Sequence, residues 1–168
     1  MKICVLWGFG HYPPLNPPHP MTRSYTSLHY HIVFGTKNRE PWLHASWRTR
    51  LHEYLGGTVN GLDGFSQGVG GVADHVHLLA GLKATHRLSD VVREIKKASN
   101  AWIHDGMGVQ GFSWQEGYAA FTISPPARDL VKGYIANQEQ RHMKQDFRGE
   151  LQLMLERAEI DFDAEYLC

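Results

Sequence analysis

The chain has 168 residues, of which 42% are hydrophobic, and this fits one domain of ordinary size with a buried core. Lys plus Arg and Asp plus Glu both number 17, so the composition excludes the strongly basic class of nucleic-acid-binding proteins. Cys4 and Cys168 lie at opposite ends and fit neither a disulfide framework nor a zinc-binding spacing. The cysteines therefore predict a reducing, cytoplasmic setting.

The first twenty residues differ from the rest of the chain. The short apolar run ICVLWGFG is followed by the proline-rich HYPPLNPPHP, and the run is too short to span a bilayer and lacks a small-residue cleavage site. Met21 precedes the first well-patterned segment. We expect residues 1–20 to be a disordered extension or an upstream start that is not used in the cell, and residues 21–168 to form one domain without a membrane anchor.

The remaining sequence alternates between β-prone and helical patterns. In chain order it predicts a strand at 27–36, a helix at 42–55 that stops at Gly56-Gly57, a turn-like segment at 60–67, a strand at 69–82, a helix from Ser89 or Asp90 to about 103, a strand or hairpin at 112–124, a helix from about Pro125 past Gln140, and a short helix at 151–158. With the helices on one face of a small, mostly antiparallel sheet, this order predicts an α+β sandwich of the ferredoxin-like or RRM-like type. The opposite face of the sheet is then free for a ligand.

Charge is distributed unevenly along this pattern. Residues 21–60 and 83–104 each carry five basic against two acidic residues, whereas residues 146–168 carry seven acids and two arginines. Lys37, Arg39, Lys96 and Lys97 lie in the two basic segments and are candidates for phosphate contacts. The alternative is an ordinary solvated face.

The segment ADHVHLLAGL places two imidazoles in an apolar, β-prone run. Because successive side chains alternate between the faces of a strand, His75 and His77 project together and Val76 points away. With a third ligand from elsewhere, such a pair can hold a divalent metal on a rigid sheet. Asp74, directly before the pair, can orient a ligand histidine or simply end a turn. The alternative is a half-exposed strand with two solvated histidines.

A second set of polar residues lies on the helix expected after Ser124. Tyr134, Gln138 and His142 are spaced by four, so they share one face of a continuous helix. A carboxamide oxygen is a suitable third ligand for a hard divalent cation. A tyrosine beside such a cation suits phosphoryl transfer through a covalent phosphotyrosine. The alternative is a core tyrosine with two surface residues.

Taken together, the two sets of residues resemble one known family. His75-Val76-His77 matches the pattern histidine, hydrophobic residue, histidine, and GYIANQEQRHMKQDF resembles the tyrosine helix of the single-tyrosine HUH transposases. These are the small transposases of insertion sequences that act on single-stranded DNA, together with relatives associated with repetitive extragenic palindromes (REP). The likeness runs from about residue 24 to 167 and includes HYHIVFGTKNREPWL and WQEGYAAFTIS.

The resemblance implies that Tyr134 is the nucleophile and that His75, His77 and Gln138 bind Mg²⁺ or Mn²⁺. It implies cleavage and rejoining of single-stranded DNA beside a hairpin through a 5′-phosphotyrosine, and a homodimer in which the tyrosine helix of one subunit can serve the other. Arg141 and His142 stand where many relatives have two histidines, and we keep both as candidate DNA contacts. An alternative function is a domesticated REP-type protein that binds or processes hairpins without autonomous transposition.

Two other classes of phosphate enzyme fit the sequence less well. Histidine-triad hydrolases use alternating histidines and would need a third histidine at position 79, where this chain has Leu79. Replication initiators and relaxases share the histidine pair, yet they are typically larger and place the tyrosine differently.

Overall fold

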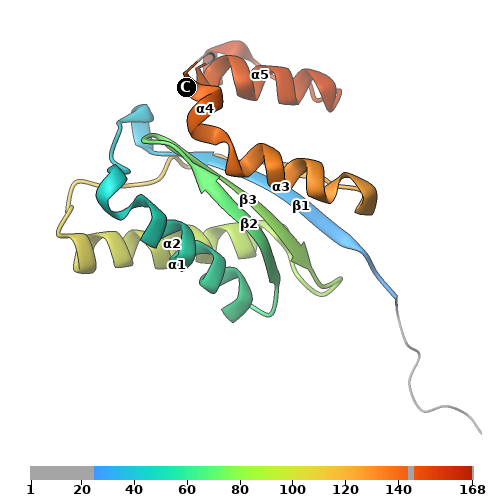
Figure 1. Cartoon of the computed structure of the whole chain (residues 1–168), viewed down its shortest axis with the longest axis horizontal. Coiled ribbons are helices and arrows are strands. Elements are labelled where there is room, and N and C mark those ends of the chain that lie inside the picture. Colours follow the sequence, from blue (N-terminus) through green and yellow to red (C-terminus); the bar gives the residue numbers. More distant parts are fainter. Residues whose placement is uncertain (1–24, 144–145, 168) are drawn as a thin grey trace, which may run out of the picture.

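The protein, described here from a computed structural model, is an α+β structure built on one four-stranded antiparallel sheet (Figure 1). The structure describes residues 25–143 and 146–167, so the extension expected at 1–20 lies outside the described residues. The strands are β1 (Leu28–Gly35), β2 (Phe65–Gly71), β3 (His75–Leu82) and β4 (Ala119–Thr122), in the sheet order β2-β3-β1-β4. The helices are α1 (Ala45–Gly61), α2 (Leu88–Met107), α3 (Arg128–Ala136), α4 (Gln138–His142) and α5 (Phe147–Arg157). Short 3-10 turns lie at Lys37–Arg39, Pro125–Ala127 and Ala164–Tyr166. No helix among the described residues is long and apolar enough to cross a membrane.

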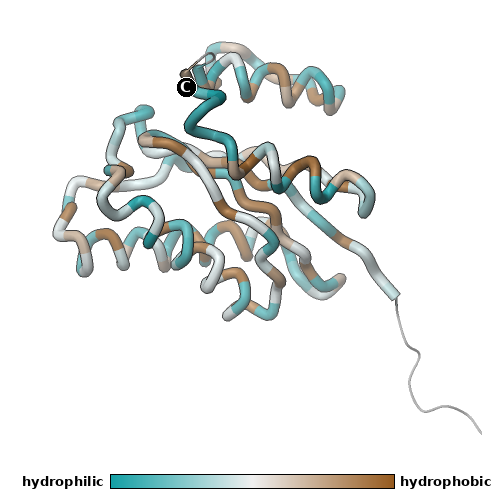
Figure 2. The backbone as a smooth tube through the Cα atoms, in the orientation of Figure 1, coloured by the Kyte–Doolittle hydropathy of each residue, from teal (hydrophilic) through white to brown (hydrophobic). Residues whose placement is uncertain are grey.

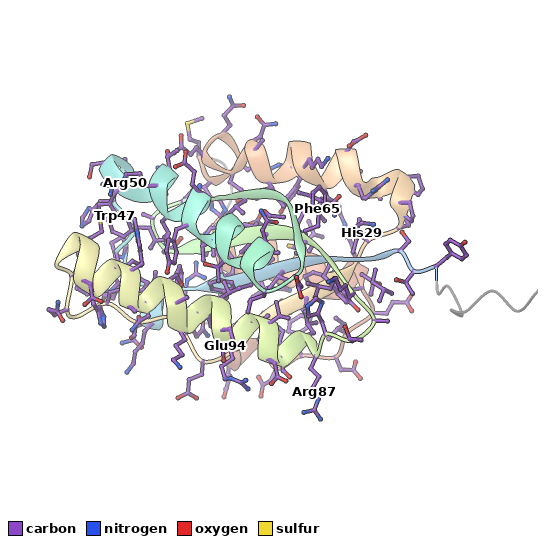
Figure 3. The ribbon with its side chains drawn as sticks, turned by 90° about the horizontal axis from the view of Figure 1, so that it is seen from below. His29, Trp47, Arg50, Phe65, Arg87 and Glu94 are labelled. Carbon is purple, nitrogen blue, oxygen red and sulfur yellow. The ribbon has the colours of Figure 1, made fainter. Side chains whose placement is uncertain are left out.

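One face of the sheet carries the hydrophobic core. Alternate residues of the central strands point to this face, and α1 and α2 pack side by side against them (Figure 3). The core side chains include Ile32, Phe34, Val76, Leu78, Ala80, Leu51, Leu55, Val92 and Ile95. Each large apolar side chain buried in this way contributes about 1.5–3 kcal/mol. The core therefore fixes the two central strands that carry the histidines.

The other face of the sheet is not free, which corrects the expectation of helices on one face only. Helix α3 packs on β2 and β3, and α4 and α5 follow it on the same side (Figure 1). Helix α4 is hydrophilic, in contrast to the apolar stretches of the central strands (Figure 2). The physical reason is that the buried polar residues of this face need partners, and α3, α4 and α5 supply them.

Two boundaries in the first half of the chain differ from the sequence prediction. Helix α1 continues through Gly56-Gly57 to Gly61. Gly56 is buried, and a Cβ at this position would lie 3.0 Å from Ser66 Oγ. Glycine here permits close packing on β2 rather than ending the helix. The single strand expected at 69–82 is instead divided between the two strands of a hairpin: residues 69–71 end β2, which begins at Phe65, and β3 begins at His75.

Differences in the second half concern the tyrosine segment and the tail. Only Ala119–Thr122 of the expected strand at 112–124 pairs as a strand, with one further bridge between Thr36 and Trp114. The helix expected from Pro125 past Gln140 is broken at Asn137, whose φ of −101° and ψ of 21° are not helical. The tail helix begins at Phe147, earlier than expected, because Asp146 caps it by accepting a hydrogen bond from the Gly149 amide at 2.9 Å.

Candidate metal and tyrosine site

Three histidines from the two central strands lie together on the sheet face covered by α3 to α5. His75 and His77 are fully buried and His31 of β1 is 4% exposed. His31 Nε2 lies 2.9 Å from His77 Nδ1. Burial lowers the pKa of His75 to about 4 and that of His31 to about 3. Burial also lowers the pKa of His77, so all three imidazoles are neutral near pH 7, which is the form that binds metals.

Glu150 of α5 brings a carboxylate to this histidine pair. It is 5% exposed, and its Oε2 lies 3.7 Å from His75 Nε2 and 3.5 Å from His77 Nε2. His142 Nε2 donates to the same oxygen at 2.9 Å. Burial pushes the pKa of Glu150 up, but the hydrogen bond from His142 and the nearby His77 outweigh burial and lower this pKa well below its usual range. Glu150 is therefore an ionised, buried carboxylate.

The chemistry of this donor set fits a divalent cation. Ligand atoms of His75, His77 and Glu150 all lie within 4.8 Å of one another, and the buried His77 Nε2 has no hydrogen-bond partner. Gln138 Oε1 lies 3.5 Å from His75 Nε2, while its amide nitrogen donates to Glu150 at 2.9 Å. Carboxylate and carboxamide oxygens are ligands that Mg²⁺ and Mn²⁺ prefer, and neutral imidazoles bind divalent transition metals, so the mixed set suits a divalent cation.

Tyr134 of α3 lies directly beside this donor set in the same chain. Its hydroxyl donates to Glu150 Oε1, and its ring centroid is 5.9 Å from those of His31 and His77. The Arg141 guanidinium carbon lies 4.2 Å from the centre of the Tyr134 ring. Burial and the hydrogen bond to Glu150 raise the pKa of Tyr134 above its ordinary value. Tyr134 is thus held as a neutral phenol at the edge of the donor set.

The position of Tyr134 depends on how closely α3 approaches β2. A Cβ on Gly70 would lie 2.4 Å from the Ile135 carbonyl oxygen, so only glycine allows this approach. Gly71 is equally restricted, since its Cβ would lie 2.2 Å from the His75 carbonyl oxygen. These two glycines, which match no phosphate-binding loop in the sequence, therefore serve the packing of the tyrosine helix and of the strand hairpin.

A second layer of polar groups surrounds His75. Asp74 Oδ1 lies 2.7 Å from His75 Nδ1, which directs Nε2 toward Glu150. Arg39 donates to Asp74 Oδ2 at 2.6 Å. The Arg39 guanidinium also lies 3.7 Å from the centre of the Phe147 ring, and the Phe147 ring centroid is 4.2 Å from that of His75. Arg39, a candidate phosphate contact, is thus engaged with the groups behind the site.

The other basic candidates lie in different environments. Lys37 is exposed on the 3-10 turn after β1. Lys96 Nζ donates to the carbonyl oxygens of Gln115, Glu116 and Gly117 at 2.6–3.2 Å, and burial lowers the pKa of Lys96 to about 8. Lys97 is exposed on α2, which covers the face opposite the histidines. The structure therefore brings Arg39, Arg141 and His142 to the site, and it leaves Lys97 away from it.

Sequence reasoning missed two members of the cluster. His31 had a usable signal, because His29-Tyr30-His31 is a second alternating histidine pair in a strand that pairs with β3. Glu150 had none, since it lies in an acidic tail with no spacing that relates it to Tyr134 or His75.

The fold and this cluster define a class of protein: an α+β domain that presents a tyrosine beside a carboxylate and a strand-borne histidine pair. A family model described as "Transposase IS200 like" matches residues 24–138. The chain therefore belongs to the IS200-like transposase family.

Two solved structures are similar to this chain in fold. A candidate transposase from Deinococcus radiodurans R1 is 26% identical with a TM-score of 0.58, over 70% of this chain and 96% of that one. A REP-associated tyrosine transposase bound to a REP hairpin is similar in fold, with 18% identity and a TM-score of 0.54 over 73% of each chain. No curated protein sequence matches the chain.

Proposed function

We propose that the protein cleaves and rejoins single-stranded DNA at hairpin-flanked sites, with Tyr134 as the nucleophile. The observation that carries this proposal is the convergence of Tyr134, Gln138 and the pair His75 and His77 on one carboxylate, Glu150, although the histidine pair lies far in the sequence from the other three residues. Membership of a transposase family supports a DNA-cleaving reaction.

In this proposal His75 Nε2, His77 Nε2 and Glu150 hold a divalent cation, Mg²⁺ or Mn²⁺, and Gln138 Oε1 is a further ligand. Such a cation supplies Lewis-acid chemistry by polarising the phosphodiester. Asp74 keeps the proton on His75 Nδ1 and leaves Nε2 free. His77 Nδ1 in the same way donates to His31 Nε2, which leaves His77 Nε2 free.

Tyr134 carries the covalent step. Its oxygen forms a bond to phosphorus, the bond from phosphorus to the 3′ oxygen breaks, and the phenolic proton is balanced by the one that the 3′-hydroxyl gains. The product is a 5′-phosphotyrosine that conserves the energy of the broken bond, so a 3′-hydroxyl can later attack it and rejoin strands. The hydrogen bond to Glu150 fixes the direction of the Tyr134 oxygen before the substrate binds.

A homodimer with exchange of the tyrosine helix is part of the expectation from family resemblance. Tyr134 already lies beside His77 of its own chain. We therefore propose that the first cleavage occurs within one chain, and that dimerisation serves a later step such as strand exchange.

The test is incubation of the protein with end-labelled single-stranded hairpin DNA and Mg²⁺ or Mn²⁺, followed by denaturing electrophoresis. We expect a covalent adduct for the wild type and for Tyr118→Phe, which removes an exposed phenol. Tyr134→Phe should give no adduct, and an adduct in that variant would refute the mechanism. Binding of hairpin DNA by the wild type without any adduct would favour the domesticated REP-type alternative.

A further inference from the structure

We propose that the cavity between β4 and the end of α5 binds a nucleobase of the single-stranded DNA, next to the phosphate that Tyr134 attacks. This inference rests on the proposed function and deepens it, since it assigns a subsite for the substrate. The cavity has a volume of about 520 Å³, which lies in the usual range of small-molecule sites.

The sheet forms the floor of the cavity and α5 forms its wall. His31 and Phe121 are directly paired across β1 and β4 and face the same side, with ring centroids 6.3 Å apart. Met154 and Arg157 come from α5, and Ile160 follows that helix. A nucleobase in this cavity lies between an aromatic floor and a largely apolar wall.

Two residues that line the cavity contact Tyr134. Met154 Sδ lies 4.0 Å from the Tyr134 hydroxyl oxygen, and the His31 ring contacts the edge of the Tyr134 ring at a centroid distance of 5.9 Å. Both residues also line the cavity. Only one layer of side chains therefore separates the cavity from the nucleophile, so a nucleotide whose phosphate reaches Tyr134 has its base within reach of the cavity.

The lining has the chemistry that a nucleotide needs. Phe121 offers a half-buried aromatic surface on which any base can stack. Strand β4 is an edge strand, so its outer backbone groups are free of sheet pairing and can bond the edge of a base. Arg157 is exposed at the rim, and no acidic side chain lines the cavity within the part of the chain that the structure describes. The charge of Arg157 thus suits a phosphate adjacent to the stacked base.

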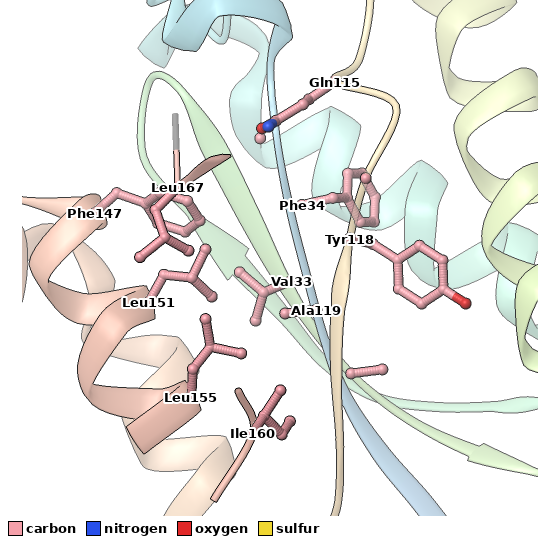
Figure 4. Close-up of a pocket in the computed structure, with 13 residues that line it drawn as sticks. Val33, Phe34, Gln115, Tyr118, Ala119, Phe147, Leu151, Leu155, Ile160 and Leu167 are labelled. Carbon is pink, nitrogen blue, oxygen red and sulfur yellow. The ribbon is translucent and has the colours of Figure 1, made fainter. Parts of the chain in front are cut away.

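A neighbouring cavity makes a useful contrast. It has a volume of about 290 Å³ and lies under α5 between Leu151, Leu155 and the sheet residues Val33 and Ala119 (Figure 4). Its described lining residues include no charged side chain, and neither His31 nor Met154 is among them. It therefore lacks both the cation and the contact with Tyr134 on which the assignment depends.

The experiment uses the full-length Tyr134→Phe protein, which cannot form the phosphotyrosine. The probe is a 12-mer of thymidine in which alternate bases are 5-iododeoxyuridine, which forms cross-links to neighbouring aromatic and methionine side chains on irradiation. We expect the cross-linked peptides to contain Phe121 or Met154. In fluorescence-anisotropy titrations with labelled (dT)12, Phe121→Ala should bind about fivefold or more weakly, whereas Phe65→Ala, which removes an exposed phenyl on β2, should not change the affinity.

A second variant keeps the test independent of folding. Arg157→Gln should weaken binding and make it less dependent on salt, and Arg148→Gln, an exposed arginine of the same helix, should do neither. Cross-links confined to other peptides, or unchanged affinity in both Phe121→Ala and Arg157→Gln, would overturn the subsite. The adduct assay on the wild type separates the two proposals: an adduct without cross-links at the cavity refutes only the subsite, and cross-links there without an adduct refute only the cleavage mechanism.

Discussion

Replacing Glu150 by glutamine tests whether this carboxylate is a metal ligand. Three donors converge on it: Tyr134 and Gln138 on Oε1, and His142 on Oε2. In Glu150→Gln the amide oxygen can still accept from Tyr134 and Gln138. Its nitrogen then takes the place of Oε2, where it can donate to a His142 tautomer that accepts at Nε2. The variant should therefore fold with a cost of only about 1–2 kcal/mol, but with its nitrogen at the position of Oε2 it offers the cation neither a negative charge nor an oxygen there.

The size of the effect follows from ligand loss. Residues that merely support a metal ligand change affinity by about 10–100-fold, so we expect loss of the ligand itself to weaken Mn²⁺ binding at least about 10-fold. At an Mn²⁺ concentration of about 100 Kd, the wild type gains about 2.7 kcal/mol of stability, whereas a variant with a 10-fold higher Kd gains about 1.4 kcal/mol. The difference of about 1.3 kcal/mol corresponds to a Tm increase that is roughly 3–5 °C smaller.

The assay is thermal unfolding with and without Mn²⁺, supported by calorimetric titration. Glu156→Gln is the matched control, because Glu156 lies exposed on the same helix. An equal Mn²⁺-dependent Tm increase in Glu150→Gln and the wild type would refute Glu150 as a ligand. A higher yield of covalent adduct in Glu150→Gln would instead show that the carboxylate blocks the site.

Three further predictions concern packing, pH and charge. Gly70→Ala should destabilise the protein by about 1–3 kcal/mol in urea unfolding and lower the adduct yield. Gly68→Ala is the control and should have neither effect, because a Cβ on Gly68 would meet only one atom, at 3.9 Å. Equal effects of the two substitutions would refute the argument that Gly70 permits the close approach of α3 to β2. Burial lowers the pKa of His52 to about 4, so the unfolded chain binds a proton between about pH 6.5 and 4 that the folded chain does not, and stability falls as pH falls. We expect His52→Gln to lose about 1–2 kcal/mol less than the wild type between pH 7 and 5, and parallel pH profiles would contradict this. Lys96→Met should lower the Tm in thermal unfolding, because it removes three hydrogen bonds to carbonyl oxygens. Lys97→Met should leave both the Tm and the salt dependence of DNA binding unchanged, because Lys97 is exposed on α2, away from the histidines; a salt dependence that falls by about one unit would show that Lys97 contacts a phosphate.

Local sequence patterns were sufficient for part of the fold and part of the site. The alternation of apolar and histidine residues in 75–82 determines that His75 and His77 share one face of a strand. The apolar stripe of α2 likewise predicts which side of that helix packs on the sheet. Both are periodicity arguments that need no knowledge of distant contacts.

Helix and strand ends were less predictable, because tertiary packing decides them. The pair Gly56-Gly57 is typical of a helix end, but α1 continues through it, and Gly56 packs closely on β2. Asn137 interrupts the tyrosine segment, so Gln138 reaches the site from α4 rather than from the helix that carries Tyr134.

The sequence by itself thus determined the family resemblance, the α+β class and the histidine pair with its candidate tyrosine. Only the tertiary structure decided that the second sheet face is covered, that His31 contacts His77, and that Glu150 lies beside the histidine pair. The physical reason is that a strand or helix pattern shows only which way a side chain points. A ligand set needs atoms within a few ångströms of one another, and the distances between remote segments are fixed only when those segments pack together.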